Sequence, residues 1–398
     1  MIKPIPQGYK QTKVGVIPED WKVVKLGDVS TIQRGASPRP IHDLKWYDSK
    51  NKNVGWVRIS DVSKSRKYLI STIDYFSKDG IANSRFLKSG SVIMSICATI
   101  GKPIITAIDT CIHDGFVGFS NLNRINKEFL YYLLSKSEYK FSLLGQTGSQ
   151  ANLNSDLVRI TNIALPHLEE QVKIAEILTM WDDAIAKQEE LIKQKQLLKK
   201  GLMQQIFSQK LRFKDDNGNN YPAWETKKLK DICIIKKGVQ LSRVDMVENG
   251  CYPVLNGGLE YSGYTNSYNT NEDTITISEG GNSCGVVNFI NCKFWSGGHC
   301  YALINILHEK MYLYHMLKYN EAIIMNLRVG SGLPNIQKST LEKVLVPVPA
   351  LPEQTKIANF LTTLDDGITN LTEQLKQLQL QKKGLMQQLL TGKVRVKV

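Results

Sequence analysis

Residues 166–205 read PHLEEQVKIAEILTMWDDAIAKQEELIKQKQLLKKGLMQQ, and residues 349–388 read PALPEQTKIANFLTTLDDGITNLTEQLKQLQLQKKGLMQQ. The two segments align without a gap at an offset of 183 residues, and 24 of the 40 aligned positions are identical. The similarity continues past them, where Lys210-Leu211-Arg212-Phe213 matches Lys393-Val394-Arg395-Val396. A long segment that occurs twice predicts a chain with two equivalent halves, and this repeat decides the fold class.

A weaker echo precedes each copy, because Trp21, Leu26, Asp28 and Gly35 correspond to Trp224, Leu229, Asp231 and Gly238. The blocks that follow, 22–165 and 225–348, share little beyond pieces such as Asn152-Leu153 against Asn335-Ile336. Both blocks contain short β-type runs, at 54–59, 91–96, 274–277 and 286–290, and later helical patterns at 127–139 and 308–325. The sequence therefore predicts an α+β fold with an internal two-fold repeat, divided into a variable domain 1–165, a helical region 166–214, a variable domain 215–348 and a helical region 349–398.

Each repeated segment carries apolar residues at alternating steps of three and four, which is the pattern of a coiled-coil seam. The second copy is the more regular, and Gln188, Lys195 and Lys199 interrupt the first. The predicted interface residues are Ile174, Leu178, Trp181, Ile185, Ile192 and Leu202, and Ile357, Leu361, Leu364, Ile368, Leu371, Leu375, Leu378 and Leu385.

Two arrangements of these helices are open. The simplest closure pairs them antiparallel, whereas the alternative packs each helix on its own domain as an ordinary core helix. Gly201 and Gly384 recur inside the helical stretch at a cost of about 1 kcal/mol each relative to alanine. Their recurrence indicates either a close crossing of helices or simple inheritance through duplication.

The composition favours a polyanionic partner, because 51 basic residues against 37 acidic ones give a net charge of +14. No apolar run reaches the roughly 20 residues that a bilayer requires, and the N-terminus lacks the apolar region of a signal peptide. Seven cysteines, an odd number with no C-x-x-C pair, favour reduced thiols in a cytoplasm. We therefore expect a cytoplasmic protein without a membrane partner.

Polar and basic residues at the expected loops are candidates for phosphate and base-edge contacts with DNA. They are Arg34, Arg39, Arg58, Lys64, Arg66, Lys67 and Asn152 in the first block, and Arg243, Asn256, Tyr264, Asn282, His299, Arg328 and Asn335 in the second.

No set of residues points to catalysis. Asp20-Trp21-Lys22 has the form of a nuclease motif without a second acid, and Trp21 reads as a core residue. His113-Asp114 and the glycine-rich Ser278-Glu279-Gly280-Gly281 stand isolated, the six histidines lack metal-ligand spacing, and no phosphate-binding loop or amino-methyltransferase signature occurs. The sequence indicates a binding protein. Two alternative functions remain open. One is a standalone methyltransferase or nuclease, and the other is a coiled-coil scaffold that binds only protein.

The repeated segment resembles the conserved region of type I restriction–modification specificity subunits. The resemblance rests on Pro349-x-Leu-Pro-Glu353-Gln354-x-Lys356-Ile357-Ala358, on Leu364-Asp365-Asp366, and on Gln381-Lys382-Lys383-Gly384-Leu385-Met386-Gln387. The segments 15–21, 56–61, 252–254 and 277–281 are similar to parts of the target recognition domains of that family, so the resemblance covers essentially the whole chain.

The resemblance implies that each variable domain reads one half of a split site in double-stranded DNA, and that the helices set the distance between the halves. It also implies two modification subunits docked on the helices, which would supply S-adenosylmethionine and the methyltransferase chemistry, and restriction subunits that add ATP-driven translocation and cleavage. This chain would itself hold no cofactor and no metal and would catalyse nothing.

Overall fold

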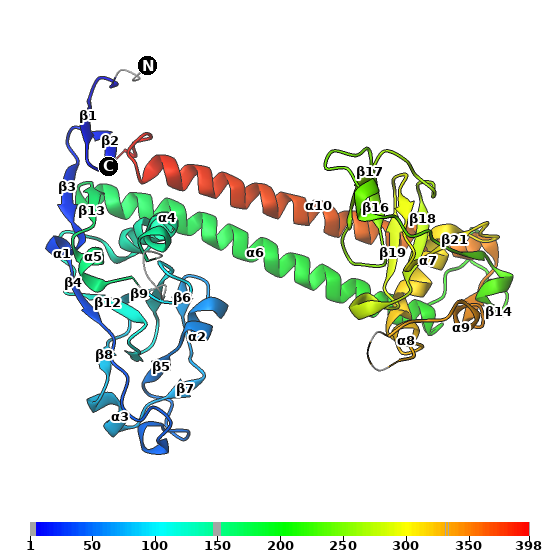
Figure 1. The fold of residues 1–398 in the computed structure, drawn as a ribbon, viewed down its shortest axis with the longest axis horizontal. Coiled ribbons are helices and arrows are strands. Elements are labelled where there is room, and N and C mark those ends of the chain that lie inside the picture. The colour runs from blue at the N-terminus through cyan, green and yellow to red at the C-terminus, as the bar shows by residue number, and fades with distance from the viewer. Residues whose placement is uncertain (1–4, 146–152, 331, 333, 398) are drawn as a thin grey trace. The chain divides into compact units, whose positions relative to one another are not determined.

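The computed structural model describes residues 5–145, 153–330, 332 and 334–397, and these form two compact units. Unit 1 comprises Met1–Lys187 and Leu375–Val398, and unit 2 comprises Gln188–Gln374. Two long helices, α6 (Leu168–Phe207) and α10 (Leu351–Leu389), each contribute residues to both units (Figure 1). The units therefore cut across the four sequence regions, because each unit takes part of both helical segments.

The two helices are paired antiparallel, as the seam predicts. In unit 2, Gln188 Nε2 donates a hydrogen bond to the Leu371 carbonyl at 2.9 Å, and Lys199 forms an ion pair with Asp365 further along. In unit 1, Lys382 forms the equivalent ion pair with Asp182 at 2.5 Å between Nζ and Oδ1. The polar residues that interrupt the seam thus bond to the facing helix, except Lys195, which is exposed.

Both alternatives for the helices hold, at different parts of their length. The ends are core helices: Ile174 and Leu178 lie in the core of unit 1 with Leu389, and Ile357 and Leu361 lie in the core of unit 2. The middle is a two-helix seam of half-buried residues, among them Ile185, Ile368 and Leu371. Of the two explanations for the recurrence of Gly201 and Gly384, a close crossing of helices is wrong, because a Cβ at either glycine would meet no heavy atom within 4 Å outside its own helix among the described residues.

Unit 1 is built on two sheets, with strand orders β4-β12-β9-β10-β6 and β7-β5-β11-β8. Two further pairs, β1-β2 and β3-β13, complete its strands. The strands are β1 (Tyr9–Thr12), β2 (Gly15–Pro18), β3 (Lys22–Lys25), β4 (Thr31–Arg34), β5 (Gly55–Val57), β6 (Tyr68–Leu69), β7 (Asp74–Tyr75), β8 (Arg85–Leu87), β9 (Val92–Ser95), β10 (Pro103–Thr106), β11 (Thr110–Ile112), β12 (Phe116–Ser120) and β13 (Asn162–Leu165). The helices are α1 (Leu26–Val29), α2 (Ile59–Lys64), α3 (Lys78–Ala82), α4 (Lys127–Gly145) and α5 (Ser155–Arg159).

Unit 2 repeats this plan with sheets β15-β21-β18-β19 and β17-β16-β20 and the pair β14-β22. Its strands are β14 (Glu225–Lys228), β15 (Ile234–Lys237), β16 (Tyr252–Leu255), β17 (Gly263–Thr265), β18 (Thr274–Ser278), β19 (Val287–Ile290), β20 (Trp295–Ser296), β21 (Cys300–Ile304) and β22 (Leu345–Val348). Its helices are α7 (Lys310–Tyr319), α8 (Glu321–Met325) and α9 (Lys338–Leu341). The α+β prediction is confirmed.

Three elements differ from the expected runs, and one of them is α4, which runs on to Gly145 instead of ending at residue 139. The strand expected over 54–59 ends at Val57, because Asp61 accepts a hydrogen bond from the Arg58 backbone at 2.8 Å and caps helix α2. The helical pattern over 308–325 is divided at Asn320 into α7 and α8.

A buried glutamate closes each unit in the same way. Trp21, fully buried as expected, donates its indole N–H to Glu170 at 3.0 Å, and Arg395 binds both oxygens of that carboxylate. In unit 2, Trp224 and Arg212 hold Glu353 by the same three bonds. The segment after each long helix therefore packs against the start of the other, which explains why the repeat extends to these arginines.

Candidate nucleic-acid interface

In unit 1, two of the predicted DNA-binding residues meet at Asp114. Arg34, the last residue of β4, donates from Nε to the Asp114 carbonyl at 2.7 Å, and Arg39 Nη2 lies 3.7 Å from Asp114 Oδ2. The Ser37 hydroxyl donates to Asp114 Oδ1 at 3.0 Å. Glycine is required at position 35, because the Cβ of any other residue there would lie 2.0 Å from the His113 carbonyl oxygen.

The electrostatics of this cluster keep one negative charge among the arginines. Burial alone would raise the pKa of Asp114, but the Ser37 hydroxyl, His113 and Arg34 together lower it below the usual range. Burial lowers the pKa of His113, against the opposing effect of Asp114. Asp114 is therefore ionised and His113 neutral near pH 7.

In unit 2, three predicted residues, Asn256, His299 and Asn335, line a cavity of about 610 Å³. Glu279 lies in its wall, where Oε1 accepts from Lys237 Nζ at 2.6 Å and from the Tyr301 hydroxyl at 3.0 Å. The rest of the wall is formed by Gly257, Gly258, Gly280, Gly281, Ser283 and Pro334.

The two sites occupy equivalent places. Arg34 lies opposite Val117 on β12, and Lys237 lies opposite Tyr301 on β21, so both basic residues end the first strand of the equivalent sheets. Gly238 repeats the close approach of Gly35, since its Cβ would lie 2.2 Å from the Gly297 carbonyl oxygen. Lys237, Glu279, His113 and Asp114 were not among the predicted site residues. The sequence did contain a signal for Lys237. Gly35 corresponds to Gly238, and this alignment places Lys237 at the position of the predicted residue Arg34.

Of the other predicted residues, Asn282 adjoins the unit 2 cavity, because it lies between the wall residues Gly281 and Ser283. Arg58 is close enough to His113 for its charge to help lower the pKa of that histidine. Arg58 forms an ion pair with Asp74 at 2.6 Å, and Lys64 and Arg66 line a separate cavity of about 460 Å³. In unit 2, Tyr264 lies on β17, and Arg243, Asn282 and Arg328 are exposed. Asn152 lies outside the described residues.

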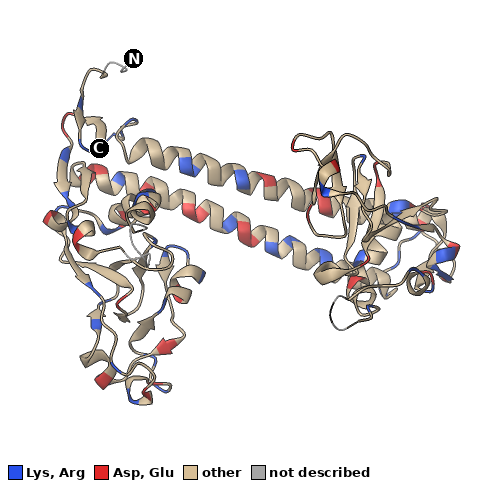
Figure 2. Ribbon diagram, in the orientation of Figure 1, with Lys and Arg blue, Asp and Glu red and all other residues tan. Residues whose placement is uncertain are grey.

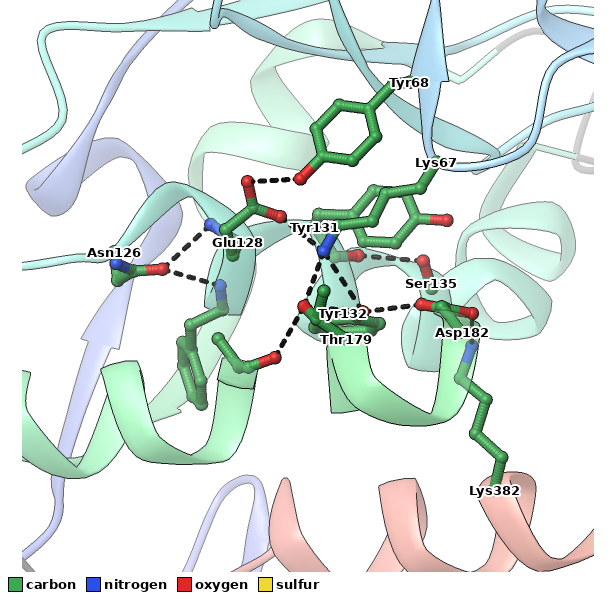
Figure 3. Close-up of polar contacts among 12 residues, drawn as sticks. Lys67, Tyr68, Asn126, Glu128, Tyr131, Tyr132, Ser135, Thr179, Asp182 and Lys382 are labelled. Atoms are coloured by element: carbon green, nitrogen blue, oxygen red, sulfur yellow. Dashed lines mark hydrogen bonds and ion pairs between the residues drawn. The ribbon is translucent and has the colours of Figure 1, made fainter. Parts of the chain in front are cut away.

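The prediction that Lys67 contacts DNA is wrong. Its side chain is 7% exposed, and its ammonium group lies 2.5 Å from Glu128 Oε2 and donates to the Thr179 and Tyr132 hydroxyls at 2.8 and 3.1 Å (Figure 3). An ammonium group enclosed by a carboxylate and two hydroxyls does not reach a phosphate. Lys67 instead ties the segment before β6 to helices α4 and α6.

The Lys67 cluster also reaches the seam. The Tyr132 hydroxyl donates to Asp182 Oδ2 at 2.5 Å, and Asp182 pairs with Lys382 (Figure 3). Unit 2 has a related cluster at positions 183 residues away: His315 replaces Tyr132 and lies 3.2 Å from the Thr362 hydroxyl and 3.7 Å from Asp365. In this junction between a long helix and its domain, the helix residues Thr179 and Asp182 recur as Thr362 and Asp365. The domain residue changes from Tyr132 to His315.

Charge is dispersed over the fold. Figure 2 shows both charges along α6, where the acidic residues lie between Glu169 and Glu190 and four of the six lysines lie beyond Glu190. None of the described helices is long and apolar enough to cross a membrane. Within the described ranges, no group of three or more His, Cys, Asp or Glu residues is placed to hold a metal ion.

Known proteins are similar to this chain over its whole length. The family model for the type I restriction modification DNA specificity domain matches twice, over residues 18–195 and 222–380. Two Methanocaldococcus jannaschii proteins are described as the MjaX and MjaIX type I restriction enzyme specificity subunits, the first provisionally. They are 28% and 24% identical over 98% of this chain and over 97% and 96% of their own lengths.

Solved structures share the fold. The crystal structure of a type I restriction–modification S subunit from M. genitalium matches with a TM-score of 0.61 at 17% identity, over 93% of this chain and 96% of that chain. A second structure, described under complex assembly and conformational transition of the type I system, matches with a TM-score of 0.60 at 19% identity, over 95% and 99%. At these identities the likeness concerns the fold alone.

Proposed function

This chain belongs to the type I restriction modification DNA specificity family and is a non-catalytic DNA-recognition subunit, and we propose that its two domains read the two halves of a bipartite site in double-stranded DNA. The observation that carries the proposal is the repetition of one domain plan with two unlike loop sets, since unlike loops read unlike bases. The clusters at Arg34 and at Lys237 place basic and hydrogen-bonding groups at equivalent edges, as phosphate and base contacts require.

The paired helices are proposed to fix the distance between the two half-sites. Their antiparallel pairing is supported in each unit by bonds between α6 and α10, such as Gln188 to Leu371 and Lys382 to Asp182. Because an α-helix rises about 1.5 Å per residue, its length would set the gap in the recognised DNA.

We propose that the helices also dock two modification subunits, on a face that is identical in both copies. Seven exposed residues of α6 recur as seven exposed residues of α10 and fall on one side of the helix. They are Lys193, Gln194, Leu197, Lys200, Gly201, Gln204 and Gln205, matched by Lys376, Gln377, Leu380, Lys383, Gly384, Gln387 and Gln388. This set is called the repeated face below.

The seam shows why the repeated face supports docking. Seam positions tolerate change, since Gln188 and Ile192 correspond to Leu371 and Leu375, and the exposed Lys195 corresponds to Leu378. The exposed face is identical in the two copies, although several seam residues differ between them. One kind of partner that binds twice best explains this difference. In unit 1, this face also borders a cavity of about 910 Å³, on whose other side Tyr139 of α4 is 75% exposed.

In the complete system, restriction subunits would join this complex and add ATP-driven translocation and cleavage, and the assembly would act on DNA in the cytoplasm.

Co-expression with a cognate modification subunit tests the proposal. We expect an adenine methyltransferase with one copy of this chain and two of the partner, and sequencing of methylated DNA should return one bipartite motif. The purified chain alone should bind DNA with an affinity that falls steeply as salt rises. Methylation by the lone chain, or a complex that modifies DNA without a bipartite motif, would contradict the proposal.

A further inference from the structure

Two short segments that look isolated in the sequence lie beside the equivalent basic residues of the two units. His113-Asp114 lies beside Arg34, and Ser278-Glu279-Gly280-Gly281 lies beside Lys237. Each segment brings one carboxylate to the same edge of the fold, although Asp114 follows β11 and Glu279 follows β18. A negative charge at a surface that meets DNA phosphates is unfavourable unless a hydrogen-bond donor on the DNA faces it.

Glu279 has the geometry for such a donor. Its Oε1 accepts from Lys237 and Tyr301, so one oxygen is held on both sides. Its Oε2 is buried and accepts no hydrogen bond from the described residues, and His299 Nδ1 lies 3.5 Å from it. A buried carboxylate oxygen usually has a donor. Glu279 and His299 both line the cavity of about 610 Å³, so a donor that enters the cavity would reach Oε2 once the exposed His299 side chain turns aside.

The base edges of DNA limit which donor this is. In the major groove, only the N4 amino group of cytosine and the N6 amino group of adenine donate hydrogen bonds. We propose, resting on the proposed DNA recognition, that Glu279 in the second domain and Asp114 in the first are base-reading residues. Each accepts a hydrogen bond from the exocyclic amino group of a cytosine or an adenine in its half-site.

The neighbouring groups fit this assignment. Lys237 and Tyr301 hold the Glu279 carboxylate in one orientation, and Ser37 and Arg39 hold Asp114. The same lysine and arginines offset the carboxylate charge near the DNA backbone. The glycines at 257, 258, 280 and 281 leave the cavity wall without side chains, so that a base edge can come close.

The test uses Glu279→Gln and Asp114→Asn in the complete chain, each co-expressed with the modification subunit, with methylated motifs read by sequencing. Each variant should lose about tenfold in preference at a single position of one half-site and leave the other half-site unchanged. Glu260→Gln and Asp79→Asn, which neutralise exposed acids of the same two domains, should leave the motif unaltered. Glu279→Asp keeps the charge beside Lys237 but withdraws the carboxylate by one methylene, and it too should relax that position.

The outcomes separate this inference from the proposed function. If the wild-type complex methylates a bipartite motif and all three reading variants keep every position of it, the inference is wrong and the proposed function stands. If the wild-type complex returns no bipartite motif, the proposed function itself fails. Thermal unfolding of each variant distinguishes lost base reading from lost folding. A substitution that removes only base reading changes the motif and leaves the melting temperature of the variant equal to that of the control variants.

Discussion

Glu353 and Glu170 are carboxylates with side chains 0% and 2% exposed, each held by an arginine that follows the opposite long helix. Removal of one partner from a buried pair leaves an uncompensated charge, which costs more than the pair itself contributes. We expect Arg212→Met to destabilise unit 2 by about 3–5 kcal/mol, measured as a lower denaturant midpoint.

The matched control for that variant is Lys173→Ala. Lys173 lies 3.3 Å from Glu176 and both side chains are more than half exposed, so the loss should stay below about 1 kcal/mol. Equal effects of Arg212→Met and Lys173→Ala would show that the buried glutamate does not depend on its arginine.

His315 makes unit 2 sensitive to acid. Burial, followed by the positive charge of Lys199, lowers the pKa of His315 to about 4, against partial opposition from Asp365. In the unfolded chain its pKa is about 6.5, so on acidification the unfolded state takes up the proton first. The stability from this group is complete above pH 6.5 and is lost as the pH falls from 6.5 to 4, by up to about 3 kcal/mol.

His315→Gln should therefore flatten the loss of stability between pH 6.5 and 4, measured as urea midpoints across that range. Glutamine is neutral throughout and retains a group for the Thr362 hydroxyl. The exposed His42 provides the control, since His42→Gln should leave the slope as it is in the wild type. An unchanged slope in His315→Gln would show that His315 takes up its proton at the same pH in the folded and the unfolded chain.

At the scale of elements, the helical glycines distinguish folding from docking. A Cβ at Gly384 meets no described atom within 4 Å outside its own helix, so Gly384→Ala should stabilise the isolated chain by about 1 kcal/mol. Gly384→Leu should be equally well folded but should bind the modification subunit less tightly, because its side chain projects from the repeated face.

Gly367 is the matched control for Gly384. It is also helical, exposed and without a neighbour within 4 Å, but the other copy has Ala184 at that position. Gly367→Leu should therefore leave partner binding unchanged in a titration followed by calorimetry. Equal binding by both leucine variants would remove the repeated face as the docking surface.

The spacing proposal is tested with both helices together. The boundaries of the two units fall at 187/188 on α6 and at 374/375 on α10, so four residues inserted at both places preserve every contact inside each unit. One added turn lengthens each helix by about 6 Å. At about 3.4 Å per base pair, the gap in the methylated motif should grow by one or two base pairs while both half-sites stay the same.

An insertion of four residues beside Gly218, in an exposed turn after α6, is the control and should leave the gap unaltered. A changed half-site with an unchanged gap in the helix variant would contradict the role of the helices as a spacer.

For the whole molecule, the repeat predicted most of the architecture because a duplicated sequence must give two similar folds. The helices predicted within 166–205 and 349–388 are observed at Leu168–Phe207 and Leu351–Leu389. Single residues were harder to place. Lys67 and Lys64 look alike in the sequence, and only the tertiary fold brings Glu128, Tyr132 and Thr179 around the first of them. Conversely, Glu279 looks isolated in the sequence, because its partners Lys237 and His299 are distant from it in the chain.

The two variable blocks are framed identically. Block 22–165 follows Trp21 and block 225–348 follows Trp224, and the first and last residues of each block are paired across two strands, Lys22 with Leu165 and Glu225 with Val348. The helix side of each junction also matches, since Thr179 and Asp182 recur as Thr362 and Asp365, whereas Tyr132 is replaced by His315. A constant frame that accepts unlike domains should accept either block at either place.

Replacement of residues 22–165 by residues 225–348 should therefore give a folded chain that reads one half-site sequence twice. The new block brings Glu279, Lys237 and His299 into unit 1 and leaves the repeated face and the seam as they are, so partner stoichiometry should not change. Lys67 and its bonds to Thr179 are lost, but His315 comes with the block and meets the same threonine and aspartate. Sequencing of methylated DNA should show the first half-site replaced by a copy of the second. A motif that retains the original first half-site would mean that block 22–165 does not read it.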